Sequence, residues 1–166
     1  MPQSRWTLAR VVVDDGVDDD GVNTVTTFRY EEGRYDRFER EFYGFGKVTE
    51  EHRDASNGDA LYRSVITEYR TDSYYSRGLK SRELTVDATN HPFVEIAHSY
   101  EFVGIGGAPA TQAELLLSPT ATVFPQLARS DRRYFEDSLG PTKRTHSSTW
   151  NWRMTRSSGV VLGSWP

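Results

Sequence analysis

The acidic segment of residues 14–21, DDGVDDDG, has the clearest capacity for metal chemistry in the chain. A calcium loop needs oxygen ligands at alternate positions and a bidentate glutamate at its twelfth position. With Gly21 as the sixth position, Asp18 and Asp20 take the third and fifth. The first position is then a glycine and the twelfth is Thr27, so both required carboxylates are missing. The segment therefore favours a solvated hairpin tip, whose negative charge discourages pairing between sheet edges, over a calcium site.

The chain has four histidines and no cysteine, and their spacing does not indicate a metal site. His52, His91, His98 and His146 contain no HxH or HExxH pattern, so we expect no zinc. His98 alternates with apolar residues, which predicts a hydrogen-bonded core histidine. His91 precedes a proline in a predicted turn, where we expect an exposed ring. The absence of cysteine excludes disulfides, thiolate catalysis and cysteine-based zinc sites.

No catalytic or cofactor motif is complete in this sequence. The GIGG segment at 104–107 lacks the third glycine, the Lys-Ser/Thr pair and the following helix of a phosphate loop. No serine stands in a GxSxG elbow. Glu39 and Glu41 would share a strand face, but they are interleaved with Arg37 and Arg40, which favours a salt-bridged surface. The sequence therefore predicts a protein that is not an enzyme and that holds no metal or cofactor.

Composition and charge limit the classes of protein to which this chain can belong. The chain has 166 residues, 36% of them hydrophobic and 27% charged, with a net charge of −4. This balance suits a globular domain or a fragment of a larger protein, and it disfavours non-specific binding to nucleic acid. Aromatic and basic residues alternate over 28–45, as in single-strand binders, but nearby carboxylates cancel the positive charge. No apolar run approaches the roughly 20 residues of a membrane helix, and the start MPQSRWTLAR predicts no signal peptide.

The elements that must position these residues have the two-residue period of β-strands. Val25 and Thr27 alternate with Thr26 and Phe28, for example. We expect strands over residues 6–15, 23–31, 46–54, 61–71, 79–88, 93–103, 120–137 and 145–154. Asn57-Gly58 is expected to supply positive φ angles in one turn. The expected fold is all-β, with antiparallel hairpins in a curved sheet and at most one short helix near 111–117.

Residues 35–46, YDRFEREFYGFG, combine charge, aromatic bulk and closely spaced glycines. We interpret this stretch as structural. Its aromatic side chains would fill a sheet face and its charges would pair across strands. Gly44 and Gly46 would let the backbone turn or bulge closely around Phe45.

The longer segment 28–48, FRYEEGRYDRFEREFYGFGKV, resembles a segment shared by SpvB-type proteins, Tc-toxin B subunits and related Rhs/YD-repeat proteins. The shared pattern is approximately Y-x-x-G-x-Y-D-x-x-x-R-E-F-x-G-F-G-x-V. The residues in register are Tyr30, Gly33, Tyr35, Asp36, Arg40, Glu41, Phe42, Gly44, Phe45, Gly46 and Val48. Residues 74–102 and 122–137 are similar to the segments that follow in such proteins. The family's Tyr-Asp-x-x-Gly-Asn repeat is missing after them, and residues 155–166 are expected to be an irregular or artefactual end.

The resemblance implies a long parent chain whose strands wind into a hollow shell around a toxic C-terminal domain. Residues 1–166 would form one β-rich segment of that wall. Its partners would be the rest of the shell chain or a companion Rhs-type subunit, together with the encapsulated toxin domain. Family members imply a secreted or cell-surface location and a role in virulence as insecticidal toxin complexes. The family's ADP-ribosylation and autoproteolysis belong to other regions, so no catalytic residue carries over.

A carbohydrate- or receptor-binding β-module is the alternative function. Four tryptophans could offer flat stacking faces to sugars, although such residues more often fill a core. They are Trp6, Trp150, Trp152 and Trp165. Exposed tryptophans, with red-shifted fluorescence that a glycan quenches, would favour the binding module.

Overall fold

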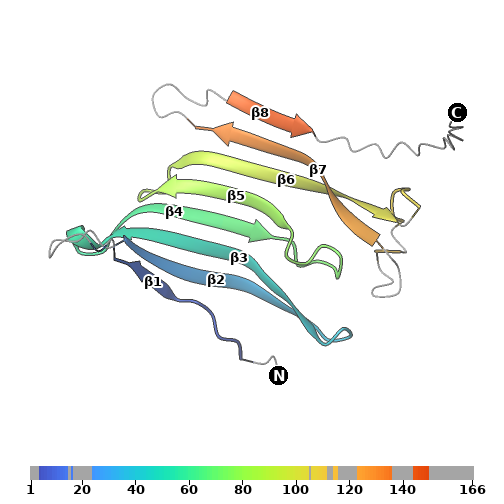
Figure 1. Cartoon of the computed structure of the whole chain (residues 1–166), viewed down its shortest axis with the longest axis horizontal. Coiled ribbons are helices and arrows are strands. Elements are labelled where there is room, and N and C mark those ends of the chain that lie inside the picture. Colours follow the sequence, from blue (N-terminus) through green and yellow to red (C-terminus); the bar gives the residue numbers. More distant parts are fainter. Residues whose placement is uncertain are drawn as a thin grey trace, which may run out of the picture.

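The computed structural model describes residues 4–14, 16, 24–104, 106–111, 114–115, 123–135 and 144–149. These residues form one 8-stranded antiparallel sheet in which the strands lie in sequence order. Each strand pairs with its neighbours along the chain, so the sheet is a continuous meander. The sheet is open and curved (Figure 1), which confirms the expected all-β fold.

The strands match the expected alternating segments, with shifts at their ends. They are β1 (Arg10–Val13), β2 (Thr24–Asp36), β3 (Glu41–Asp54), β4 (Ala60–Tyr69), β5 (Lys80–Asp87), β6 (Pro92–Gly104), β7 (Val123–Tyr134) and β8 (Arg144–Thr149). The first is shorter than expected: within the described residues its ladder with β2 covers Arg10–Val13, and the Ala9 carbonyl accepts one further bond from Phe28. Among the described residues, no helix is long and apolar enough to cross a membrane.

β3 begins five residues earlier than the expected strand at 46–54. The ladder with β2 continues to the pair Asp36–Glu41 by way of a β-bulge. Arg34 pairs with Gly44 and Tyr35 with Phe42, which leaves Tyr43 as the extra residue. The bulge lets the aromatic and glycine segment extend the hairpin rather than form a loop.

The turn between β3 and β4 differs in detail from its expected geometry. Ala55–Asn57 form a 3-10 turn, capped by the Asp54 side chain, which accepts the Ser56 N–H at 3.0 Å. The positive φ angles fall on Gly58 and Asp59, at 62° and 59°, and not on Asn57. The 3-10 turn takes up Asn57, so the left-handed residues follow one position later.

The described part of the expected 111–117 helix is a single turn. Glu114 and Leu115 are helical, and the Leu115 N–H donates to the Thr111 carbonyl at 3.1 Å. The Glu114 carboxylate accepts the Thr111 N–H at 2.7 Å, and the Glu114 N–H donates to the Thr111 hydroxyl at 3.3 Å. These reciprocal bonds form a capping box, which explains why the turn starts at this threonine.

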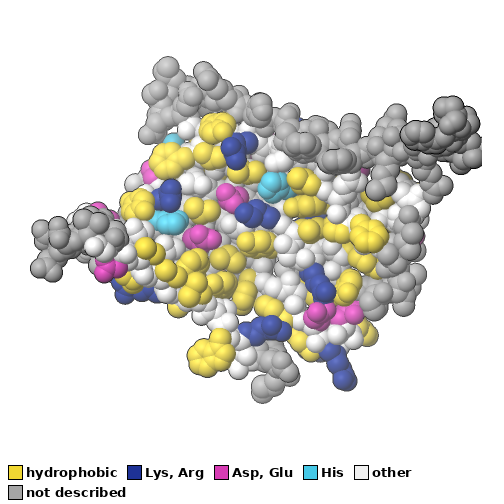
Figure 2. Space-filling model, in the orientation of Figure 1, with side chains coloured by type: hydrophobic (Ala, Val, Ile, Leu, Met, Phe, Trp, Pro, Cys, Tyr) yellow, Lys and Arg dark blue, Asp and Glu magenta, His cyan; other side chains and the backbone are white. Residues whose placement is uncertain are grey.

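The strand register divides the side chains between two faces of the sheet, since directly paired residues share a face. One face carries cross-strand ion pairs, and we call it the ion-pair face. The other, which we call the apolar face, carries Phe28, Tyr30, Val48, Val65, Val94, Ile96, His98 and Tyr100, together with the charged side chains of Glu50, Arg63, Glu83 and Arg132. Figure 2 shows this second face, with hydrophobic side chains spread over several strands and only scattered charges between them.

Few side chains are fully buried, because the described residues form a single layer. The buried hydrophobic residues are Val25, Tyr43, Val86 and Val123. Domains usually bury a sheet face against a second layer of helices or strands. No such layer covers either face within the part of the chain that the structure describes.

Candidate functional site

Three aromatic rings of the β2–β3 hairpin pack together at the end of the sheet where β2 turns into β3. The Phe45 ring centroid lies 5.0 Å from that of Tyr30 and 5.1 Å from that of Phe42. The Arg5 guanidinium lies 4.5 Å from the centroid of the Phe42 ring. Gly33 lies under Phe45, since a Cβ there would be 3.3 Å from Phe45 Cε1. The glycine therefore leaves the room that the aromatic ring occupies.

The two other glycines of this hairpin have different physical roles. Gly44 has a φ of 108°, a conformation that side chains with a Cβ rarely adopt. A Cβ on Gly46 would lie 2.7 Å from Glu32 Oε2 and 3.0 Å from Glu32 Cβ. Gly44 thus meets a backbone requirement of the bulge, whereas Gly46 allows the close approach of the neighbouring strand.

The turn of this hairpin is organised by Asp36. Its carboxylate oxygen accepts the backbone N–H groups of Phe38 and Glu39, both at 2.9 Å. Arg40 closes the turn with a φ of 54°. The Phe38 side chain at the tip is 98% exposed, so the apolar tip has no partner within the described residues.

An arginine from the β4–β5 loop holds this hairpin in place. The Arg77 guanidinium pairs with the Glu41 carboxylate and lies 4.2 Å from the centroid of the Tyr74 ring. It also lies 5.9 Å from the centroid of the Tyr43 ring, which is only 6% exposed. Burial, followed by nearby carboxylates, raises the pKa of the Tyr43 hydroxyl. We call Arg77 with Glu41, Tyr43 and Tyr74 the arginine clasp.

The loop that carries Arg77 is itself fixed by an internal polar cluster. Arg70 binds both carboxylate oxygens of Asp72, at 3.1 and 2.7 Å, and the fully buried Ser76 hydroxyl donates to Asp72 at 2.8 Å. The hydrogen bond from Arg70, aided by that from Ser76, lowers the pKa of Asp72 to about 2. The Arg70 guanidinium also lies 5.5 Å from the centroid of the Phe102 ring, which ties the loop to β6.

The ion-pair face holds a continuous chain of charges across β4, β5, β6 and β7. Arg82 pairs with Glu68 at 3.0 Å and with Glu95 at 2.7 Å, and Arg133 pairs with Glu95 at 3.0 Å. The hydrogen bond from Arg82 is the largest cause that lowers the pKa of Glu95. Charges of both signs are paired across this network, which suits a hydrated outer surface better than a site for a charged ligand.

The histidines do not form a metal site within the described residues, where no three acidic or histidine side chains are grouped for a metal. His98 is half-buried, but its Nδ1 lacks a hydrogen-bond partner among the described residues, so the expected hydrogen bond is wrong for that atom. His91 is half-buried rather than exposed, and its carbonyl accepts the Asp87 N–H at 2.9 Å in the β5–β6 turn. Its backbone N–H donates to the Asp87 carboxylate at 2.8 Å.

Some candidate segments are described only in part, and other candidate residues lie outside the described part of the chain. In the acidic loop, Asp14 accepts the Gly16 N–H at 2.9 Å, while Asp18, Asp20 and Gly21 are not described. Trp150, Trp152 and Trp165 also lie outside, as do residues 155–166.

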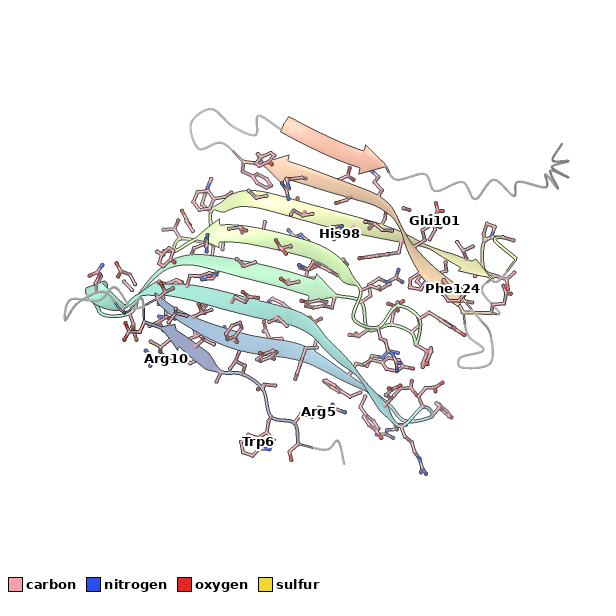
Figure 3. The ribbon with its side chains drawn as sticks, viewed as in Figure 1. Arg5, Trp6, Arg10, His98, Glu101 and Phe124 are labelled. Carbon is pink, nitrogen blue, oxygen red and sulfur yellow. The ribbon has the colours of Figure 1, made fainter. Side chains whose placement is uncertain are left out.

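The N-terminal edge of the sheet carries several exposed apolar side chains beside the exposed Arg5 and Arg10. Trp6 is fully exposed and points away from the sheet (Figure 3). Leu8, Val12 and Val13 are each more than half exposed on the same edge. Edge strands usually carry charge or proline that prevents pairing with other strands. This edge is therefore suited to contact with another surface.

Sequence reasoning missed the arginine clasp and the Asp72 cluster. Arg77 and Glu41 are 36 residues apart, so no local period connects them. The cluster does have a local signal, because Asp72, Ser73 and Ser76 follow the turn-forming pattern of short polar side chains that bind nearby backbone groups.

A family model and several solved structures relate this chain to the TcdB proteins of insecticidal toxins. Residues 1–78 match the family model of the insecticide toxin TcdB middle/N-terminal region. The crystal structure of TcdB2-TccC3 without its hypervariable C-terminal region aligns with 78% of this chain, with a TM-score of 0.58 and 18% identity. The TcdB2-TccC3-Cdc42 crystal structure aligns over the same share, with a TM-score of 0.56 and 16% identity.

A third match is the Tc holotoxin pore of Photorhabdus luminescens, which aligns with 70% of this chain at a TM-score of 0.52 and 15% identity. This chain spans only 8% of the length of each of these three matched chains. No curated protein sequence matches it. The structural matches establish a shared fold, and the family model covers the aromatic hairpin and the arginine clasp. Over residues 1–78 the chain is therefore similar to the middle/N-terminal region of the insecticide toxin TcdB, which makes it Tc toxin B-subunit-like.

Proposed function

We propose that this chain is a non-catalytic wall segment of a shell that encloses or delivers a toxin. The observation that carries the proposal is the single-layer curved sheet (Figure 1), with one face richer in apolar side chains (Figure 2) and one richer in ion pairs. A sheet with an apolar face needs a second layer or a partner to remove that face from water. In a shell wall, the apolar face would line the interior and the ion-pair face would meet solvent.

The two ends of the sheet support this role. β1 and β8 each have a neighbour on one side only within the described strands, so a longer sheet could continue from both. The exposed apolar residues beside β1 suit such continuation, and the small share of the matched chains that this segment covers agrees with it. The motif residues of the aromatic hairpin would then have a structural role, which is to fix the end of two long wall strands.

The partners of such a segment would be the rest of a shell chain or a companion Rhs-type subunit, and an enclosed toxin domain. The related TcdB2 structures contain TccC3, and one contains Cdc42 in addition. SpvB-type and YD-repeat character and a secreted location belong to the same proposal. They rest on the resemblance of residues 28–48.

The test is the solution behaviour of the purified chain. Size-exclusion chromatography with light scattering would give its mass, and circular dichroism would follow its thermal melt. A wall segment without its neighbours should self-associate or melt over a broad range, because its apolar face and edges lack their partners. A monomer with one sharp transition would contradict the proposal, since it would describe an autonomous module.

A carbohydrate- or receptor-binding module is a second candidate, and the exposure of Trp6 favours it. A sugar that stacks on this ring should quench and shift its fluorescence. Titration with a panel of glycans should then show saturable quenching that Trp6→Ala reduces. Phe38→Ala, which removes another fully exposed aromatic ring, is the matched control. Equal quenching in both variants would contradict a sugar site at Trp6.

A further inference from the structure

His98 is an ionisable group in the middle of the apolar face. It lies on β6 between Ile96 and Tyr100, opposite Ser130 of β7, and Figure 3 shows it in the central part of the sheet. Its Nδ1 is buried, and no hydrogen bond to that atom exists within the described residues. Serine in the paired position offers no charge that would stabilise a protonated ring.

The charged groups around His98 also do not stabilise a protonated ring. On β5, the Lys80 ammonium and the Glu83 carboxylate are paired at 2.5 Å. On β7, Arg132 lies on the same face two residues from Ser130. The Tyr100 hydroxyl is occupied, since it donates to the Lys80 carbonyl at 2.8 Å. Among the described residues, Glu83 is the carboxylate that acts on the ring, and it already holds the Lys80 ammonium.

We propose that His98 makes the β5–β6–β7 part of the sheet sensitive to acid, because protonation of its imidazole places an additional cation beside Lys80 on the apolar face and opens these strands. A charge in an apolar setting is costly unless an opposite charge compensates it. The proposal concerns this sheet and does not depend on the role of the chain as a wall segment.

The direction of the pH effect follows from the environment of the ring. Burial first, and then Lys80, lower the pKa of His98 from its ordinary 6.5, while Glu83 acts in the opposite direction. The unfolded chain therefore binds a proton more readily than the folded one. The stability that the folded sheet gains from a neutral His98 is complete above about pH 6.5, and it is lost as the pH falls below that value.

Hydrogen exchange of the purified chain tests this inference. Exchange would be measured by mass spectrometry at pH 7.5 and 5.5, with correction for the intrinsic rate at each pH. Protection of β5, β6 and β7 should fall several-fold more than that of β2 on acidification. His98→Gln should remove this difference, since its side chain does not titrate. His52→Gln is the matched control, because His52 lies on the same face in β3, where burial and Arg63 also lower its pKa.

The outcomes are distinct. Loss of the acid response in His98→Gln, with its retention in His52→Gln, would support the proposal. An equal acid response in His98→Gln, or no response in the parent chain, would overturn it. If the glutamine variant is unfolded at pH 7.5, His98→Leu replaces it, since leucine suits the apolar neighbours. Titration of the His98 ring by NMR in the parent chain is an independent check, and a midpoint at or above 6.5 would also overturn the proposal.

Discussion

At the scale of single residues, the aromatic hairpin depends on backbone positions that only glycine meets well. Gly44 has a positive φ, whereas Gly33 and Gly46 lie against a ring and a carboxylate side chain. Positive φ costs a residue with a Cβ free energy wherever it occurs, while crowding can be relieved when a flexible side chain moves. The three glycines should therefore differ in their tolerance of alanine.

Gly44→Ala should lower the free energy of unfolding by about 1–2 kcal/mol, because alanine is strained at this φ. Urea denaturation followed by circular dichroism would measure the loss. Gly106→Ala is the control, since Gly106 has no positive φ and a Cβ there would contact nothing within 4 Å. Equal midpoints for the two variants would show that the bulge does not require glycine.

Asp72 should contribute a distinct acid dependence to the stability. Its pKa is about 2, below the ordinary 3.8, because Arg70 and Ser76 bind the charged form. The stabilisation is therefore complete above about pH 4 and is lost as the pH falls toward 2. Asp72→Asn should be less stable than the parent at pH 6, and the difference should shrink at pH 2.5 in urea denaturation. A difference that stays constant with pH would contradict this account.

At the scale of elements, the arginine clasp joins two parts of the sheet that local interactions leave separate. The end of the β2–β3 hairpin extends past the ladder between β3 and β4, which begins at Lys47. The β4–β5 loop contacts this end through Arg77. Stacking on Tyr74 and the ion pair with Glu41 act on one guanidinium, so a single substitution removes both. The internal bonds of Asp72 and Ser76 hold the loop in the shape that makes this contact.

Arg77→Gln should loosen the hairpin end without unfolding the sheet. A partly exposed cation–π contact together with an ion pair is worth about 1–2 kcal/mol. Amides of residues 41–45 and 73–79 should therefore exchange at least about fivefold faster, while those of β5 stay unchanged. Arg37→Gln, which changes an exposed arginine in the same hairpin turn, should have little effect. The clasp would be refuted if both variants exchanged at the rate of the parent.

At the scale of the whole molecule, the sheet has one face richer in apolar side chains, one richer in ion pairs, and two open edges among its described strands. Such a sheet is not self-sufficient, because a single layer leaves apolar side chains in water. The exposed residues at the N-terminal edge add a hydrophobic strip beside unpaired backbone groups. This arrangement predicts association through the edge.

Val12→Lys should reduce self-association of the purified chain, since a charge on an edge strand opposes pairing with a second strand. Light scattering across a concentration series would give the change in mean mass. Phe38→Lys, which adds the same charge at an exposed position away from that edge, is the control. A similar decrease in both variants would point to net charge rather than to the edge.

The sequence was sufficient to predict the strands, because alternation with a period of two is a local signal. The β5–β6 hairpin and β4 were expected from the patterns of 79–103 and 61–71, and both are present. The start of β3 at Glu41 differs from the expected strand at 46–54, because local alternation does not show how far the ladder with β2 continues beyond the bulge at Tyr43. The turn at Asn57-Gly58 was misplaced by one residue, because a 3-10 turn and a two-residue turn share the same composition.

What the sequence determined by itself is the class of fold, the lack of a complete catalytic motif and the resemblance carried by residues 28–48. These depend on residue types and short spacings. Tertiary structure alone decided the separation of the ion-pair face from the apolar face, the arginine clasp and the partnerless Nδ1 of His98. Each of these depends on strand register, because register brings residues distant in sequence together. A shift of one position would move the side chains of a strand to the opposite face of the sheet.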